Sequence, residues 1–181
     1  MSFFDKTSVN NALDKLDDGL RKYLWIQENY LKVNVQEDSE FQKKFNHFYK
    51  VRRDQTWRSK YFELLEKNKN SVISFEKILE DLFLQTGRFE SSFSSKLIAT
   101  VNPNMPVIDS VVMRNLGLKI PIAKEERLQK TVELYNKLIE KVNELILSDD
   151  GINAISMFKQ KYPNTKVTQV KILDLILWQS R

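Results

Sequence analysis

Apolar residues recur every three or four positions along almost the whole chain, which is the spacing of an α-helix with one buried face. The predicted helices cover residues 8–32 (as one or two helices), 39–53, 55–66, 75–85, 90–100, a short segment after 109, 124–147, 151–162 and 165–179. The segments 102–106 and 120–123 are predicted to be loops. The pattern therefore predicts an all-α fold, a multi-helix bundle of about eight or nine helices.

Composition supports this interpretation. The chain has 181 residues with only four glycines and four prolines, which is little material for the tight turns of a β-sheet protein. Its length suits a single domain over residues 1–181. Within it lie N-terminal helices at 8–66 with a basic aromatic block at 41–62, a middle segment at 74–118 and C-terminal helices at 124–179.

Capping residues define several helix ends. Ser39 and Ser74 are each expected to cap the helix that follows, because a hydroxyl oxygen can accept a hydrogen bond from a free N–H of the first turn. Gly87 follows the 75–85 helix at the place where a left-handed C-cap is favoured. Asp109, between apolar residues in PVIDSVVMRNLGL, is a favoured N-cap for the residues after it.

Residue types exclude several kinds of site. The chain has no cysteine and a single histidine, His47, so disulfides, thiolate sites and multi-histidine metal sites are excluded. His47 is expected to be a surface or half-buried residue. The longest apolar run, ILDLILW, is too short to cross a bilayer, and MSFFDKTSVNN does not have the pattern of a secretory signal. We therefore expect a cytoplasmic, soluble protein without a membrane partner, a metal or a cofactor.

Positive charge is concentrated in one region. Residues 41–70 carry nine Lys and Arg against three Asp and Glu, whereas residues 1–40 carry five against eight. The block QKKFNHFYKVRRDQTWRSKYF interleaves its cations with aromatic residues. One interpretation is a surface that contacts nucleic-acid phosphates. The other is an amphipathic helix pair whose aromatic residues are core and whose cations are solvated, and the two interpretations are compatible.

Residues 87–118, GRFESSFSSKLIATVNPNMPVIDSVVMRNLGL, resemble the helix–hairpin–helix DNA glycosylase superfamily. Those proteins carry a glycine-rich hairpin of the type LPGVGRKTA. Roughly 20 residues later they have a segment of the type VDTHVRRVLNRLGL, whose Asp is catalytic. Gly87 stands about that distance before Asp109, and Asp109-Ser110 corresponds to the Asp-Thr of the family. Arg114 and the ending Leu116-Gly117-Leu118 also match.

The hairpin departs from the family pattern at two positions. Phe89 stands where the second glycine belongs, and Ser91 stands where bifunctional members have a Schiff-base lysine, with Lys96 about one helical turn later. The resemblance therefore implies a degenerate hairpin and a monofunctional DNA glycosylase of DNA repair, in which Asp109 stabilises an oxocarbenium-like species and activates a water.

The resemblance also implies double-stranded DNA as the partner. The expected DNA-contacting residues are Gly87, Arg88, Ser91, Ser92, Lys96 and Arg114, together with Lys50, Arg52, Arg53 and Arg58 of the basic block. Tyr49 or Trp57 could stack on a displaced base, although their helical spacing favours core packing.

Two other interpretations stay open. In the first, the chain is a non-catalytic helical module that binds nucleic acid or protein, and Asp109 is only a helix cap. In the second, KVTQVKILDLILWQSR docks on a partner, although apolar residues around most of a helix more often mark a buried terminal helix. Asp174 would then need a partner, which Lys171 could supply from one turn away. The sequence leaves the oligomeric state open.

Overall fold

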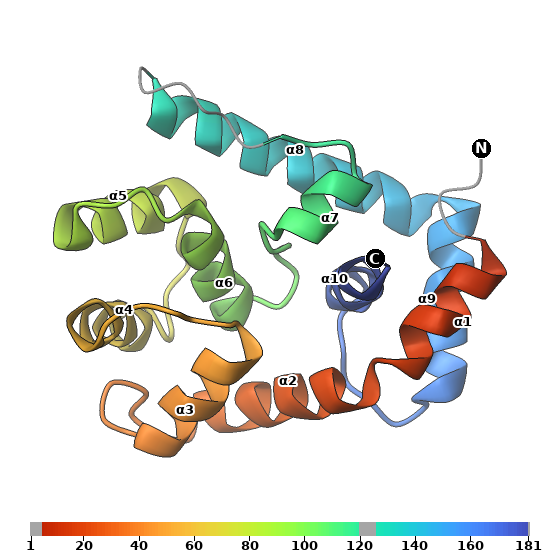
Figure 1. Ribbon diagram of the computed structural model, residues 1–181, viewed down its shortest axis with the longest axis horizontal. Coiled ribbons are helices and arrows are strands. Elements are labelled where there is room, and N and C mark those ends of the chain that lie inside the picture. The colour runs from red at the N-terminus through yellow and green to blue at the C-terminus, as the bar shows by residue number, and fades with distance from the viewer. Residues whose placement is uncertain (1–4, 120–125, 181) are drawn as a thin grey trace. The chain divides into compact units, whose positions relative to one another are not determined.

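The computed structural model describes residues 5–119 and 126–180, and this part of the chain contains helices and no strand (Figure 1). The ten helices described are α1 (Lys6–Asp14), α2 (Asp17–Tyr30), α3 (Ser39–Phe48), α4 (Gln55–Lys67), α5 (Phe75–Thr86), α6 (Ser91–Val101), α7 (Ser110–Asn115), α8 (Arg127–Leu147), α9 (Asp149–Lys161) and α10 (Gln169–Gln179). The predicted all-α class is confirmed. The predicted loop at 120–123 and the predicted start of a helix at 124 lie outside the described residues.

The helices group into two compact units. Unit 1 combines the two ends of the chain, 1–17 and 103–181, and therefore contains α1 and α7 to α10. Unit 2 is the continuous stretch 18–102, with nearly all of α2 and the whole of α3 to α6.

Helix α10 forms the centre of unit 1, where it packs against α1, α7, α8 and α9 (Figure 1). Its apolar side chains are buried almost all round the helix, which confirms the expectation of a buried terminal helix. The two charged residues within it pair with each other, because Lys171 Nζ lies 2.6 Å from Asp174 Oδ2. Their side chains are only 5% and 11% exposed. The carboxylate thus has the cationic partner that its position requires.

Hydrogen bonds and an ion pair join the end of α1 to the end of α9. The Tyr162 hydroxyl donates a hydrogen bond to the backbone carbonyl of Leu13 at 3.1 Å, and Lys161 pairs with Asp14 at 2.7 Å. The Tyr162 hydroxyl also bonds the carboxylate of Asp17. The first helix of the chain therefore completes a core whose other members come from residues after 102.

Helices α8 and α9 meet at a single residue. Ser148 follows α8 and caps α9, accepting a hydrogen bond from the N–H of Gly151 at 3.1 Å. Gly151 lies so close to α8 that a Cβ added to it would come within 1.8 Å of the Leu145 carbonyl oxygen. The sharp turn between the two helices therefore depends on the missing side chain at Gly151.

Aromatic side chains form the core of unit 2. The ring of Phe45 contacts those of Phe41, Tyr61 and Phe62, with centroids 5.9, 5.8 and 5.4 Å apart. All four residues are at most 1% exposed. These four aromatic residues of the basic block are thus core residues on α3 and α4, as the amphipathic interpretation predicts.

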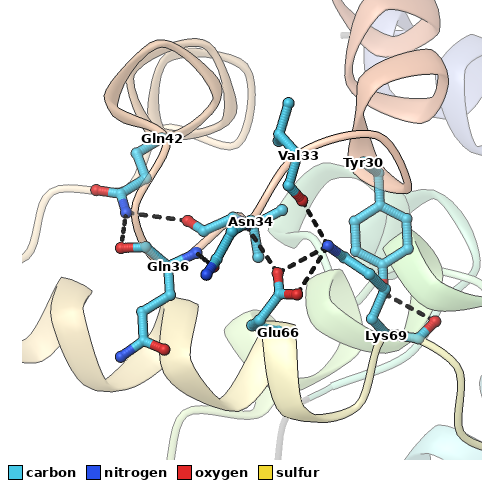
Figure 2. Close-up of polar contacts among 8 residues, drawn as sticks. Tyr30, Val33, Asn34, Gln36, Gln42, Glu66 and Lys69 are labelled. Atoms are coloured by element: carbon cyan, nitrogen blue, oxygen red, sulfur yellow. Dashed lines mark hydrogen bonds and ion pairs between the residues drawn. The ribbon is translucent and has the colours of Figure 1, made fainter.

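The connection from α2 to α3 is fastened to the end of α4 by a network of polar contacts, which Figure 2 shows. The Lys69 ammonium bonds the Val33 carbonyl and lies 2.8 Å from the Glu66 carboxylate. Glu66 in turn accepts a hydrogen bond from the Val35 N–H at 2.8 Å, and the Tyr30 hydroxyl donates to the Lys69 carbonyl. Burial raises the pKa of Tyr30, with a further contribution from the charge of Glu66. The phenol therefore stays a neutral donor.

Helix α3 differs from the prediction at both ends. The prediction that Ser39 caps it is wrong, because the Asp38 carboxylate accepts the hydrogen bond from the Phe41 N–H at 2.7 Å. The helix also ends at Phe48 instead of 53. Lys50 adopts a left-handed conformation with φ 53°, which ends the helical path. By contrast, the predicted N-cap at Ser74 is confirmed by its hydrogen bond from the Lys77 N–H at 3.2 Å.

Candidate nucleic-acid interface

A short turn joins α5 to α6 in unit 2. Gly87 ends α5 with φ 69° and ψ 14°, and its N–H bonds the Phe83 carbonyl at 2.7 Å, so the predicted left-handed C-cap is confirmed. A Cβ at Gly87 would meet no atom within 4 Å. The positive φ, rather than crowding, therefore favours glycine at this position.

Phe89 stands where the resemblance expects a second glycine, and it has a packing role. Its ring lies against that of Phe83, with centroids 4.4 Å apart. This apolar contact closes the turn between the helices, as often accompanies a glycine C-cap. Helix α6 then begins at Ser91, and its cap residue, Glu90, makes no side-chain hydrogen bond to the first turn.

Glu90 is instead paired with Arg53, from the segment between α3 and α4. Arg53 Nη2 lies 2.9 Å from Oε1 and 3.0 Å from Oε2 of Glu90 and donates a hydrogen bond to Oε2. The Glu90 side chain is 8% exposed and that of Arg53 is 33% exposed. This ion pair holds segment 50–54 of the basic block against the α5–α6 turn.

Two aromatic rings support the Arg53 guanidinium. Its carbon lies 5.5 Å from the ring centre of Phe93 on α6 and 6.0 Å from that of Trp57 on α4. The two rings pack against each other, with centroids 4.8 Å apart. A guanidinium over aromatic faces is attracted by their negative π-systems, so its position is fixed from two helices.

Exposed cations flank this pair. Lys50, Arg52 and Arg88 are exposed. The pKa of the Asp54 carboxyl is lowered, mainly by the hydrogen bond from the Trp57 N–H and to a smaller extent by the charge of Arg88, which therefore lies near Asp54. We use the name hairpin surface for Lys50, Arg52, Arg53, Arg88, Ser91 and Ser92, where the last two are half-buried residues of the first turn of α6.

Two further predicted phosphate contacts, Lys96 and Arg58, are half-buried. Lys96 is half-buried, and its ammonium donates to the Tyr49 carbonyl at 3.1 Å and lies 4.8 Å from the ring centre of Phe93. Arg58 is also half-buried. Its Nε has no solvent access and no hydrogen-bond partner among the described residues. Both side chains are thus less exposed than those of Lys50, Arg52 and Arg88.

Tyr49 and Trp57 are only 6% and 5% exposed, as expected for core residues. His47 is exposed, as expected. Glu90 belongs to the polar run Glu90-Ser91-Ser92, which the resemblance implies would face phosphates, but the sequence did not predict its pairing with Arg53.

Asp109 belongs to unit 1 and is the N-cap of α7. Its Oδ1 accepts a hydrogen bond from the Val111 N–H at 2.8 Å. The residue is half-buried between the buried pair Val107 and Ile108 and the buried Val112. The cap predicted from the sequence is confirmed, and it explains how a charged residue is tolerated among apolar neighbours.

The end of α7 explains the Leu-Gly-Leu pattern. Gly117 adopts φ 67°, and the Leu118 N–H bonds the Met113 carbonyl at 2.8 Å. This is the way in which many helices close on a left-handed glycine. Arg114 is exposed in the last turn of α7, where a cation favours the helix dipole.

Within residues 5–119 and 126–180, no group of three or more His, Asp or Glu side chains is arranged to hold a metal ion. Over the same residues, every helix falls short of the length and apolar character that crossing a membrane requires. Comparisons with family models, curated proteins and solved structures find no match to the chain.

Proposed function

We propose that the chain binds double-stranded DNA through the hairpin surface, as a diverged relative of the helix–hairpin–helix DNA glycosylases. The contact between Arg53 and Glu90 is the observation that carries this proposal. It brings a segment of the basic block against the α5–α6 turn, so that cations nearly 40 residues apart in the chain lie in one region of unit 2. Neutralisation of several phosphates at once, with release of counterions, is the main source of affinity for duplex DNA.

The chemistry of the hairpin surface suits a phosphate backbone. Arg52, Arg88 and Lys50 are exposed, where phosphates can approach them. Ser91 and Ser92 add hydroxyl groups at the N-terminal end of α6, where the helix dipole also favours negative charge. Tyr49 and Trp57, by contrast, are buried, so affinity is expected to come from charge and to depend on salt more than on base stacking.

Fluorescence anisotropy with a labelled duplex tests this binding. Arg52→Gln and Arg88→Gln should each weaken binding about fivefold, and each should lower the slope of log Kd against log salt by about one. Lys137→Gln is a matched control, because Lys137 is an exposed cation on α8 of unit 1. Equal affinities for wild type and both arginine variants, or an equal loss in the control, would exclude the hairpin surface as the binding site.

Base excision by Asp109 is the second candidate function. The capping hydrogen bond uses Oδ1, and Oδ2 has no hydrogen-bond partner among the described residues. A free carboxylate oxygen suits a general base. In the proposed step, Asp109 takes a proton from water as the water oxygen bonds to C1′ of the sugar. The N-glycosidic bond breaks, its electron pair leaves with the base, and the carboxylate stabilises the oxocarbenium-like charge.

Asp109→Asn separates this activity from the capping role. Asparagine caps helices about as well as aspartate, so folding and DNA affinity should persist. Its amide cannot act as a base, so the formation of abasic sites in a panel of lesion-bearing duplexes should be lost. Duplex binding by the wild type without product from any lesion would instead favour the non-catalytic module, in which Asp109 only caps α7.

A further inference from the structure

The Arg53–Glu90 ion pair is partly buried and incompletely hydrogen-bonded. Arg53 Nη2 bonds Oε2 of Glu90. Arg53 Nε has no access to solvent and no hydrogen-bond partner among the described residues, and the buried Glu90 Oε1 has only its ion-pair contact with Arg53 Nη2 at 2.9 Å. A buried donor that lacks a hydrogen bond costs stability. The pair therefore occupies a state that a better partner for the guanidinium could displace.

The position of Glu90 also opposes the binding of an anion. The residue precedes the first turn of α6, and its carboxylate pairs with Arg53 without capping the helix. It neutralises the Arg53 charge, so an approaching phosphate is attracted less strongly to this guanidinium. In the free protein, the anion that Arg53 binds is thus a carboxylate of the chain itself.

We propose that the Arg53–Glu90 pair is an autoinhibitory latch, in which Glu90 holds Arg53 until a DNA backbone phosphate replaces the carboxylate. This inference rests on the proposed DNA binding. The N–H groups of a guanidinium can donate hydrogen bonds to two oxygens of either a carboxylate or a phosphate, so one can replace the other. Phe93 and Trp57 hold the guanidinium from two helices, and a third of the Arg53 side chain is exposed to an incoming phosphate. The latch therefore opens when Arg53 exchanges the Glu90 carboxylate for a DNA phosphate, while its guanidinium stays in place.

Glu90→Gln tests the latch by removing the charge while keeping the shape of the side chain. The variant should bind a duplex about fivefold more tightly than wild type, and its salt slope should be steeper by about one, because Arg53 becomes an additional phosphate contact. Glu76→Gln is the matched control. Glu76 is an exposed acidic residue in the first turn of α5, at the opposite end of that helix from the α5–α6 turn. It should bind with nearly the wild-type affinity and slope.

The double variant Arg53→Gln/Glu90→Gln should lose the gain in affinity and in slope. Wild-type binding without tighter binding by Glu90→Gln overturns the latch but not the proposed function. Absence of binding by both proteins at low salt overturns both. A gain that persists in the double variant, or that equals the gain of the Glu76 control, shows a general charge effect and also overturns the latch.

A measurement on the wild type covers the case in which Glu90→Gln does not fold. The side-chain N–H resonances of Arg53 should shift when a short unlabelled duplex is added to ¹⁵N-labelled protein, because the guanidinium changes its partner. Backbone resonances of the hairpin surface report binding in the same spectra. Binding that leaves the Arg53 side-chain signals unchanged contradicts the latch.

Discussion

The buried ion pair in α10 gives a prediction about stability. Lys171 Nζ and Asp174 Oδ2 are 2.6 Å apart, and the two side chains are 5% and 11% exposed, so water cannot replace a missing partner. Asp174→Asn keeps the shape of the side chain but leaves the Lys171 ammonium without its carboxylate. Breaking a buried pair in this way costs about 3–5 kcal/mol of unfolding free energy. Most of this cost is the desolvated charge that remains, not the lost attraction.

A double variant isolates that contribution. Lys171→Met/Asp174→Leu removes both charges and keeps apolar volume on α10, so its unfolding free energy should return to within about 1–2 kcal/mol of wild type. The single variants Asp174→Asn and Lys171→Met should each be less stable than the double variant Lys171→Met/Asp174→Leu. Chemical denaturation followed by far-ultraviolet circular dichroism measures all four proteins.

An exposed pair provides the control. Lys32 and Glu28 are 2.9 Å apart but 59% and 69% exposed, so Glu28→Gln should change stability by less than about 1 kcal/mol. The burial argument fails if Asp174→Asn is no more costly than Glu28→Gln, or if the double variant is less stable than both singles. Because unit 1 and unit 2 need not unfold together, tryptophan fluorescence is recorded as a second probe.

Two further predictions concern a helix junction and a helix cap. Gly151→Ala should lower the unfolding free energy by at least about 1–3 kcal/mol, because the new methyl group would lie 1.8 Å from the Leu145 carbonyl oxygen. Chemical denaturation measures the change. Gly19→Ala is the control in the same assay, because a Cβ at Gly19 meets nothing within 4 Å. The lowered pKa of Asp54 means that its ionised form stabilises α4. This stabilisation is complete above the unfolded pKa of about 4 and is lost as pH falls through the lower pKa of the folded protein. An NMR titration of Asp54 in wild type and in Arg88→Gln measures the folded pKa. A folded wild-type pKa equal to the unfolded value would contradict the prediction.

The local features of this fold were predictable because they depend on neighbours in the sequence. The cap at Asp109, the glycine end of α5 and the Lys171–Asp174 pair all involve residues at most a few positions apart. Helical periodicity also identified the buried aromatic residues of α3 and α4. For the caps and the ion pair, the partner of a group lies within about one helical turn, where spacing alone determines which groups can meet.

The remaining features required information that spacing does not contain. Asp38 and Ser39 are adjacent residues that both favour an N-cap, and only the path of the chain decides that Asp38 is used. The end of α3 depends on the left-handed Lys50, a conformation that few side chains favour. The Arg53–Glu90 pair joins residues 37 positions apart through the packing of two helices, and no local pattern marks Glu90 as a partner.

The composition of unit 1 from both ends of the chain has a consequence for folding during synthesis. Unit 2 is a continuous stretch, so all its helices emerge from the ribosome together and can pack before the chain is finished. Helix α1 is synthesised first, yet its contacts include Tyr162, whose hydroxyl bonds a carbonyl 149 positions earlier. Helix α1 can pack only after α9 and α10 have been synthesised, so its apolar face stays exposed until then. Such distant contacts slow folding, so unit 1 is expected to form last and to be the part of a nascent chain that chaperones protect.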